Sequence, residues 1–156
     1  MTGFPTMLVP ELVHTVEDYY DGPRTGIADF RGHPHCYRSL YLDSPEWNAA
    51  EDRFELSPVT AKVRDLAVEQ FHLWQRWQAA SLEHRIDLIG EGPRVLPEDL
   101  GRYRELEAAL APHRRAAPEL LLLARGIFSN SGDGTVPLAG LRVQWTLIEG
   151  SVRDGD

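Results

Sequence analysis

Cysteine is almost absent from this sequence, and so is lysine. Cys36 is the only cysteine among the 156 residues, so the chain forms no internal disulfide. This cysteine usage is typical of proteins in a reducing compartment. Lys62 is the only lysine, and arginine supplies the rest of the positive charge.

Long hydrophobic runs are also missing. The best apolar run, Leu120–Ala124, is far shorter than the roughly 20 residues that a membrane-spanning helix needs. Residues 1–10 are apolar but lack the basic start and the long apolar core of a secretory signal. We therefore expect a soluble protein of the cytoplasm.

Positive charge is in deficit. Sixteen basic residues oppose 24 acidic ones, which gives a formal net charge of -8 at pH 7. Nucleic acids and anionic membranes are bound by clustered positive charge, whereas the arginines here are scattered along the sequence. We expect neither a nucleic-acid nor a membrane partner.

Signature motifs of catalysis are lacking too. The sequence has no GxSxG elbow, no Walker A loop, no GxGxxG fingerprint and no HExxH pair. Cys36 has histidines nearby but no local signature of a cysteine hydrolase, and we interpret it as an inert thiol on a strand. No enzyme class follows from these patterns.

Clusters of turn-forming residues divide the first part of the chain into strands. The segments between them are rich in β-branched and aromatic residues, which favour extended backbone. Phe54 and Leu56 are expected to face inward from the last of them. The predicted strands are residues 13–20, 27–30, 35–42 and 53–56.

The middle of the chain predicts two helices. Ser57 followed by Pro58 is a helix start signal, and apolar residues then recur at helical spacing up to about residue 80. A second helix is expected from near Pro97. Its buried stripe comprises Leu100, Tyr103, Leu106 and Leu110.

Two further strands end the expected order. Residues 120–128 predict a buried strand, and residues 141–147 alternate between apolar and polar side chains. The order ββββ-α-α-ββ is typical of an α+β fold, with a mostly antiparallel sheet and two helices packed on one face. We expect a single domain over residues 1–156, with frayed ends at about 1–8 and 151–156.

The segment 18–36 is dense in side chains that titrate or bind metals. His33 and His35 are two residues apart, so in extended backbone both imidazoles point to the same side. Asp29, across a short turn, would add a carboxylate, and this set suits a divalent metal such as Zn²⁺ or Fe²⁺. A polar hairpin with two exposed histidines, which needs no cofactor, explains the same pattern.

The same segment holds an arginine among turn-forming residues. Arg24 lies between Gly22 and Gly26, which predicts a guanidinium at the tip of a rigid turn, able to bind a carboxylate or phosphate. Pairing of Arg24 with Asp18 or Asp21 inside the hairpin is the plainer interpretation.

Aromatic residues fall in short strands and turns, where part of them must face outward. Exposed tyrosine and tryptophan are the residue types that dominate protein interfaces. Together with the acidic balance, they predict a surface that docks on another protein. The candidate binding residues are Tyr19, Tyr20, Asp21, Arg24 and Trp47.

In size, acidity and α+β build the chain resembles small bacterial immunity or accessory proteins. This resemblance is one of class, carried by no shared motif, and it implies no site residues. The leading hypothesis is a cytoplasmic protein-binding module that inhibits or assists a partner. The alternatives are a small enzyme with a metal or acid–base site around Asp29, His33 and His35, and a homodimeric ligand-binding protein.

Overall fold

The computed structural model describes residues 9–19, 23–40, 53–82, 93–113, 120–130 and 140–148. The chain divides into two compact units. One comprises residues 1–59 and 116–156 and contains every described strand, and the other comprises residues 60–115 and contains the helices. Each unit is described by itself.

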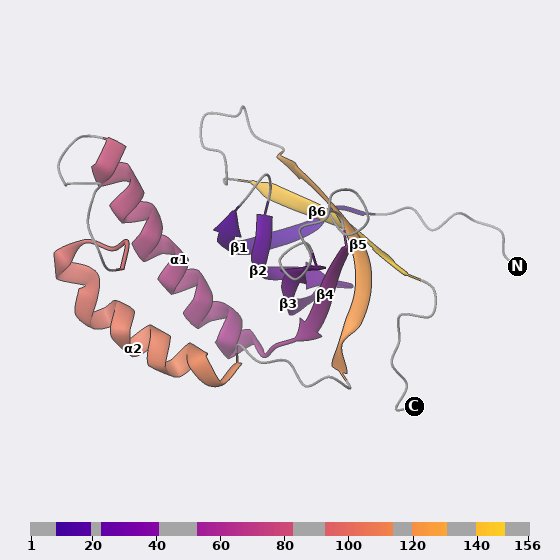
Figure 1. Cartoon of the computed structure of the whole chain (residues 1–156), viewed down its shortest axis with the longest axis horizontal. Coiled ribbons are helices and arrows are strands. Elements are labelled where there is room, and N and C mark those ends of the chain that lie inside the picture. Colours follow the sequence, from indigo (N-terminus) through magenta and orange to yellow (C-terminus); the bar gives the residue numbers. More distant parts are fainter. Residues whose placement is uncertain are drawn as a thin grey trace, which may run out of the picture. The chain divides into compact units, whose positions relative to one another are not determined.

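The first unit is a closed six-stranded antiparallel barrel (Figure 1). Each described strand pairs with its neighbours in chain order, and β1 pairs with β6 to close the ring. The predicted strand order and the antiparallel pairing are therefore confirmed, but the sheet closes into a barrel. The strands are β1 Glu11–Tyr19, β2 Pro23–Phe30, β3 His33–Ser39, β4 Arg53–Pro58, β5 Leu122–Asn130 and β6 Leu141–Leu147.

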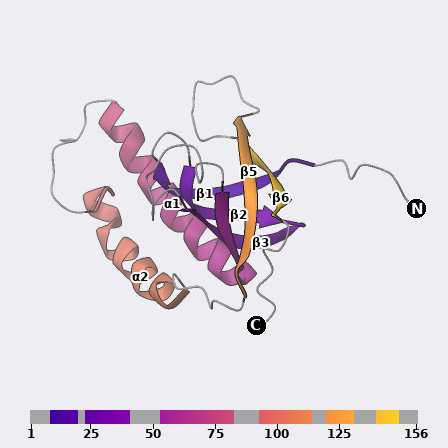
Figure 2. The same ribbon diagram turned by 45° about the vertical axis from the view of Figure 1, so that its right-hand side comes forward.

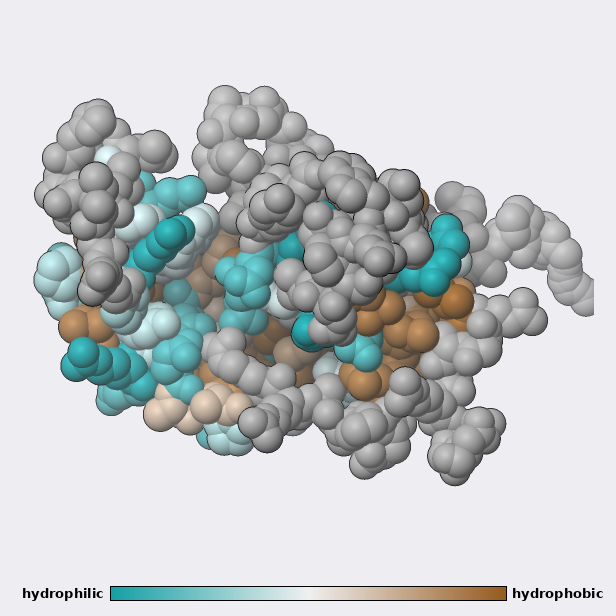
Figure 3. Space-filling model, in the orientation of Figure 1, coloured by the Kyte–Doolittle hydropathy of each residue, from teal (hydrophilic) through white to brown (hydrophobic). Residues whose placement is uncertain are grey.

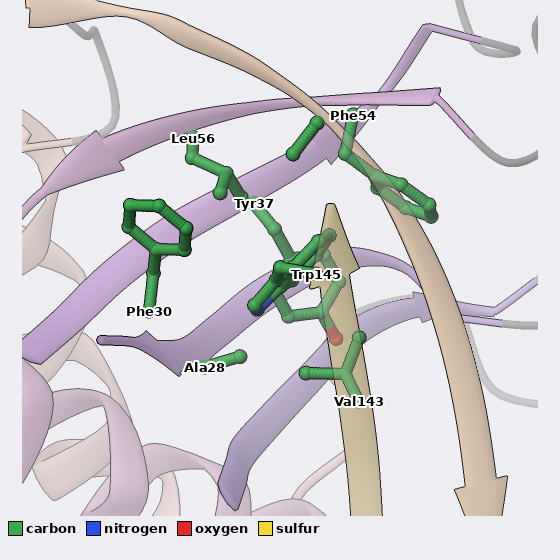
Figure 4. Close-up of a cluster of buried hydrophobic side chains, with 8 residues drawn as sticks. Ala28, Phe30, Tyr37, Phe54, Leu56, Val143 and Trp145 are labelled. Atoms are coloured by element: carbon green, nitrogen blue, oxygen red, sulfur yellow. The ribbon is translucent and has the colours of Figure 1, made fainter. Parts of the chain in front are cut away.

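The interior of the barrel is filled by aromatic and aliphatic side chains. Tyr37, Phe54 and Trp145 come from three different strands, and their rings meet edge-on or tilted at centroid distances of 5.5 to 6.1 Å. Figure 4 shows Phe30, Leu56 and Val143 directed toward the same space. Burial of this cluster is the main source of stability for the barrel, because each large apolar side chain contributes roughly 1.5–3 kcal/mol.

A two-residue turn joins β2 to β3. Arg31 and Gly32 both have positive φ, at 53° and 79°, as the favoured hairpin turns require. The backbone N–H groups of both residues donate to the carboxylate of Glu11, at 3.0 and 2.8 Å. The interval between the predicted strands 27–30 and 35–42 therefore contains a turn, but the turn takes only residues 31 and 32, and β3 begins at His33.

The second unit is a helical hairpin. Helix α1 spans Ala61–Leu82, and α2 spans Leu100–Leu110 after a 3₁₀ turn at Pro97–Asp99. In Figures 1 and 2 the two helices run side by side. Two ion pairs connect them: Arg102 of α2 pairs with Glu69 of α1, and Arg76 of α1 pairs with Asp99 of the 3₁₀ turn.

The start of α1 differs slightly from the prediction. Thr60, not Ser57, is the capping residue, because its hydroxyl oxygen accepts a hydrogen bond from the N–H of Val63 at 3.2 Å. Ser57 and Pro58 end β4 instead. A serine–proline pair is equally compatible with the end of a strand, so the local signal was ambiguous.

Two expectations about the whole chain stay predictions. One is the single domain over residues 1–156, and the other is that the helices pack on one face of the sheet. The frayed ends, about residues 1–8 and 151–156, lie outside the described residues. Among the described helices, none has the length and apolar character to cross a membrane.

Candidate functional site

The predicted metal ligands Asp29, His33 and His35 do not come together. Asp29 pairs with Pro34 across the β2–β3 ladder, so its side chain points to the opposite face from those of His33 and His35. Among the described residues, no three potential metal ligands lie close enough to hold an ion. The prediction of this metal group is wrong because alternation along the strands separates its carboxylate from its imidazoles.

Asp29 instead contacts a histidine on the neighbouring strand. Its Oδ1 lies 2.8 Å from Nε2 of His14, and both side chains are 17% exposed. The backbone carbonyl of Asp29 accepts a hydrogen bond from the indole of Trp145 at 3.0 Å. The pair therefore joins β1 to β2, with the imidazole oriented by a carboxylate.

His35 and His33 have different surroundings. His33 is exposed, whereas His35 is 8% exposed and its ring lies edge-on to Phe30 at 5.3 Å. Nδ1 of His35 donates to the carbonyl of His33 at 2.8 Å. Burial lowers the pKa of His35 below its ordinary value of 6.5, although that hydrogen bond and the charges of Glu11 and Asp29 act in the opposite direction.

Arg24 does not lie at the tip of a turn. It is the second residue of β2, and only 2% of its surface is exposed. Its Nη1 donates to the hydroxyl of Ser39 on β3 at 3.5 Å. The predicted exposed arginine is therefore wrong, because the strand begins at Pro23 and carries Arg24 into a buried position.

The predicted aromatic surface is mostly undescribed. Tyr20, Asp21 and Trp47 lie outside the described residues, and Tyr19 ends β1 without a described side chain. Another tyrosine, Tyr37, is 1% exposed and belongs to the core. Its hydroxyl donates to the carbonyl of Thr15 at 2.9 Å, and burial raises its pKa well above 10.

Another face of the barrel carries the exposed apolar side chains of the described strands. On β5 the residues Ala124, Gly126 and Phe128 point inward, so Arg125 and Ile127 point outward. Ile127 is 63% exposed, and Leu12 of β1 is 44% exposed. Figure 3 shows hydrophobic surface gathered over β5. We call the outward residues of this region the β5 face, which comprises Leu12, Arg53, Glu55, Leu123, Arg125, Ile127, Ser129, Arg142, Gln144 and Thr146.

Two arginines of the β5 face stand directly opposite each other. Arg53 on β4 is the cross-strand partner of Arg125 on β5, which places their Cβ atoms about 5 Å apart on one side of the sheet. Like charges in this arrangement destabilise a sheet. The next pair along β4 is balanced, because Glu55 lies 3.7 Å from Arg38.

Arg53 also leaves a donor unused. Its Nε is buried and, among the described residues, is the side-chain donor or acceptor that lacks a hydrogen-bond partner. A buried unsatisfied donor costs about 1–3 kcal/mol. The β5 face therefore contains an exposed isoleucine, Ile127, and an arginine, Arg53, whose Nε lacks a hydrogen-bond acceptor among the described residues.

Sequence reasoning missed the β5 face. Residues 120–128 were predicted to form a buried strand, and that prediction is wrong for Leu120 and Ile127, which are 52% and 63% exposed. One feature of the sequence could have indicated this exposed face. Apolar residues occupy both alternating rows of β5, whereas the outward row of β6 is polar. No protein family, curated protein or solved structure matches this chain.

Proposed function

We propose that this chain is a small cytoplasmic protein-binding module, an accessory, inhibitor or immunity-like protein, and that it binds its partner through the β5 face. The observation that carries the proposal is the exposure of Ile127 in the middle of a regular strand. Burying an isoleucine that is now largely solvated would contribute roughly 1–2 kcal/mol to a complex.

Closure of the barrel supports a partner bound by side chains. Each described strand has a hydrogen-bonded neighbour on both sides, so side chains make up most of the outer surface of the described barrel. Association through the β5 face requires no change in the barrel, as is common for preorganised interfaces.

The residues expected from the sequence keep a place in this proposal, with one exception. Tyr19, Tyr20, Asp21 and Trp47 remain candidates for a second part of the interface. Arg24 does not, since its substitution would disturb a buried position.

The proposal is tested by capturing the partner with matched variants. Tagged wild-type chain, Ile127→Asp and Arg104→Gln are incubated with lysate of the native host, and bound proteins are identified by mass spectrometry. Arg104 is exposed on α2 and provides the control. We expect one protein near stoichiometry with the wild type and the control, and its loss with Ile127→Asp. Equal capture by all three chains, or no protein captured, would contradict the proposal.

A small enzyme is the second candidate, favoured by the hydrogen bond between His14 and Asp29. A carboxylate that orients an imidazole is the arrangement of a general base.

A further inference from the structure

A carboxylate on β1, the strand that closes the barrel, is bound by the turn between β2 and β3. We infer that this residue, Glu11, is a latch that keeps the seam between β1 and β6 closed. Loss of its contact with the turn opens the seam locally, while the rest of the barrel stays folded. The opening itself is independent of the proposed function, whereas its effect on the β5 face rests on that function.

Both oxygens of the Glu11 carboxylate are engaged by the turn. Oε2 accepts a hydrogen bond from the N–H of Arg31 at 3.0 Å, and Oε1 accepts one from the N–H of Gly32 at 2.8 Å. Successive N–H groups of a turn form a concavity that suits an anion, and hydrogen bonds to a charged acceptor are stronger than those between neutral groups. The two contacts therefore fix the start of β1 against the β2–β3 turn.

The latch lies just beyond the end of the ladder between β1 and β2. The described register of these two strands begins at Val13, which is opposite Ala28, two residues after Glu11. Among the described pairs, Glu11 and Leu12 are matched with β6 alone. On the β2 side the carboxylate of Glu11 therefore takes the place of backbone pairing, and it holds both residues in line for β6.

A second side-chain contact limits how far the seam can open. Nε2 of His14 lies 2.8 Å from Oδ1 of Asp29 on β2. The ladder with β2 also continues from Val13 to Tyr19. Neither contact involves Glu11, so loss of the latch should free residues 11 and 12 and leave the later part of β1 in place.

The seam runs through the β5 face. Leu12 is 44% exposed on β1, and its cross-strand partner on β6 is Arg142, which belongs to the same face. Side chains directly opposite each other on one face of a sheet lie about 5 Å apart. When the seam opens, Leu12 separates from Arg142, and the β5 face loses one of its exposed apolar side chains. Glu11 is then a positioning residue, which acts on partner binding through Leu12.

Hydrogen exchange followed by NMR in Glu11→Gln tests the latch. Glutamine keeps the length of the side chain but removes the charge and leaves one carbonyl oxygen for two N–H groups. We expect the backbone amides of residues 11, 12, 142 and 143 to exchange about fivefold faster or more than in the wild type. The paired residues 25–30 and 33–38 of β2 and β3 should keep the exchange rates of the wild type.

Glu98→Gln is the matched control, since Glu98 is exposed in the 3₁₀ turn before α2, and it should change neither set of amides. Unchanged exchange at the seam in Glu11→Gln would overturn the inference. Faster exchange over the whole barrel, or failure of the variant to fold, would overturn it too, because Glu11 would then support the barrel as a whole.

Capture of the partner from lysate separates this inference from the proposed function. Reduced capture by Glu11→Gln would support the link between the latch and the β5 face. Capture at the wild-type level by a variant whose seam exchanges faster would remove that link and leave the proposed function standing. If the wild type captures no protein, the proposed function and the link both fail, while selective exchange at the seam would still support the latch.

Discussion

At the scale of single residues, Arg53 is placed where it destabilises the fold. It faces a second arginine across the strand pair, and its Nε is buried without a hydrogen-bond partner among the described residues. Methionine keeps most of the aliphatic stem and removes both the charge and the donor. We predict that Arg53→Met raises the free energy of unfolding by about 1 kcal/mol, measured by urea denaturation.

The control for this prediction is Arg104→Met, an exposed position on α2. Surface substitutions of that kind usually change stability by less than about 0.5 kcal/mol. A lower stability of Arg53→Met than of the wild type would contradict this prediction and would mean that Arg53 stabilises the fold.

His35 is predicted to make the barrel sensitive to mild acid. Because burial lowers its pKa in the folded state below 6.5, the unfolded chain binds the proton more readily. The contribution of the neutral imidazole is therefore complete above about pH 6.5 and is lost as the pH falls toward the folded pKa. Between about pH 7.5 and pH 5.5, His35→Gln should lose less stability than the wild type.

Chemical denaturation at the two pH values measures this difference. His72→Gln, at an exposed position on α1, is the control and should lose as much stability as the wild type. An equal loss in His35→Gln and the wild type would show that His35 does not contribute to acid sensitivity.

At the scale of the elements, Gly126 and Gly101 differ in the space that is available for a side chain. A Cβ atom at Gly126 of β5 would overlap the ring of Trp145, whereas a Cβ atom at Gly101 of α2 would meet no atom within 4 Å. We predict that Gly126→Ala lowers the free energy of unfolding by about 2 kcal/mol or more, because the core has no room to adjust. Gly101→Ala should raise it by up to about 1 kcal/mol. Thermal denaturation of both variants measures the contrast, and similar shifts in both would contradict the packing described for β5.

Prediction from sequence succeeded where one face of an element is buried and the other is wet. Leu141, Val143 and Trp145 alternate with polar residues, and the structure buries all three inside the barrel. The prediction of a fully buried strand failed for Ile127. Apolar residues occur on both faces of β5, and this pattern does not show which face is exposed to solvent. Prediction from sequence also failed for Asp29, since the face that a side chain occupies depends on the length of the turn between strands.

At the scale of the whole molecule, barrel closure was beyond the sequence. Closure depends on pairing between β1 and β6, which are far apart along the chain, and the local patterns of open and closed sheets are the same. Among the described residues the pairing covers Glu11 with Val143 and Leu12 with Arg142, whereas β2 and β3 pair from Thr25 with Arg38 to Phe30 with His33.

This short seam should open before the rest of the barrel. We predict that backbone amides in the paired parts of β1 and β6 exchange with deuterium faster than those between β2 and β3. Hydrogen exchange followed by NMR measures the order. Slowest exchange at the β1–β6 seam would contradict the shortness of its ladder.

The central claim, that a protein partner binds the β5 face, is tested most directly by photo-crosslinking in the native host. A photoreactive phenylalanine analogue replaces Ile127 in one chain and the exposed Arg104 of α2 in another. The account predicts one discrete crosslinked protein from position 127 and none from position 104. No crosslink at position 127, or the same products from both positions, would contradict it.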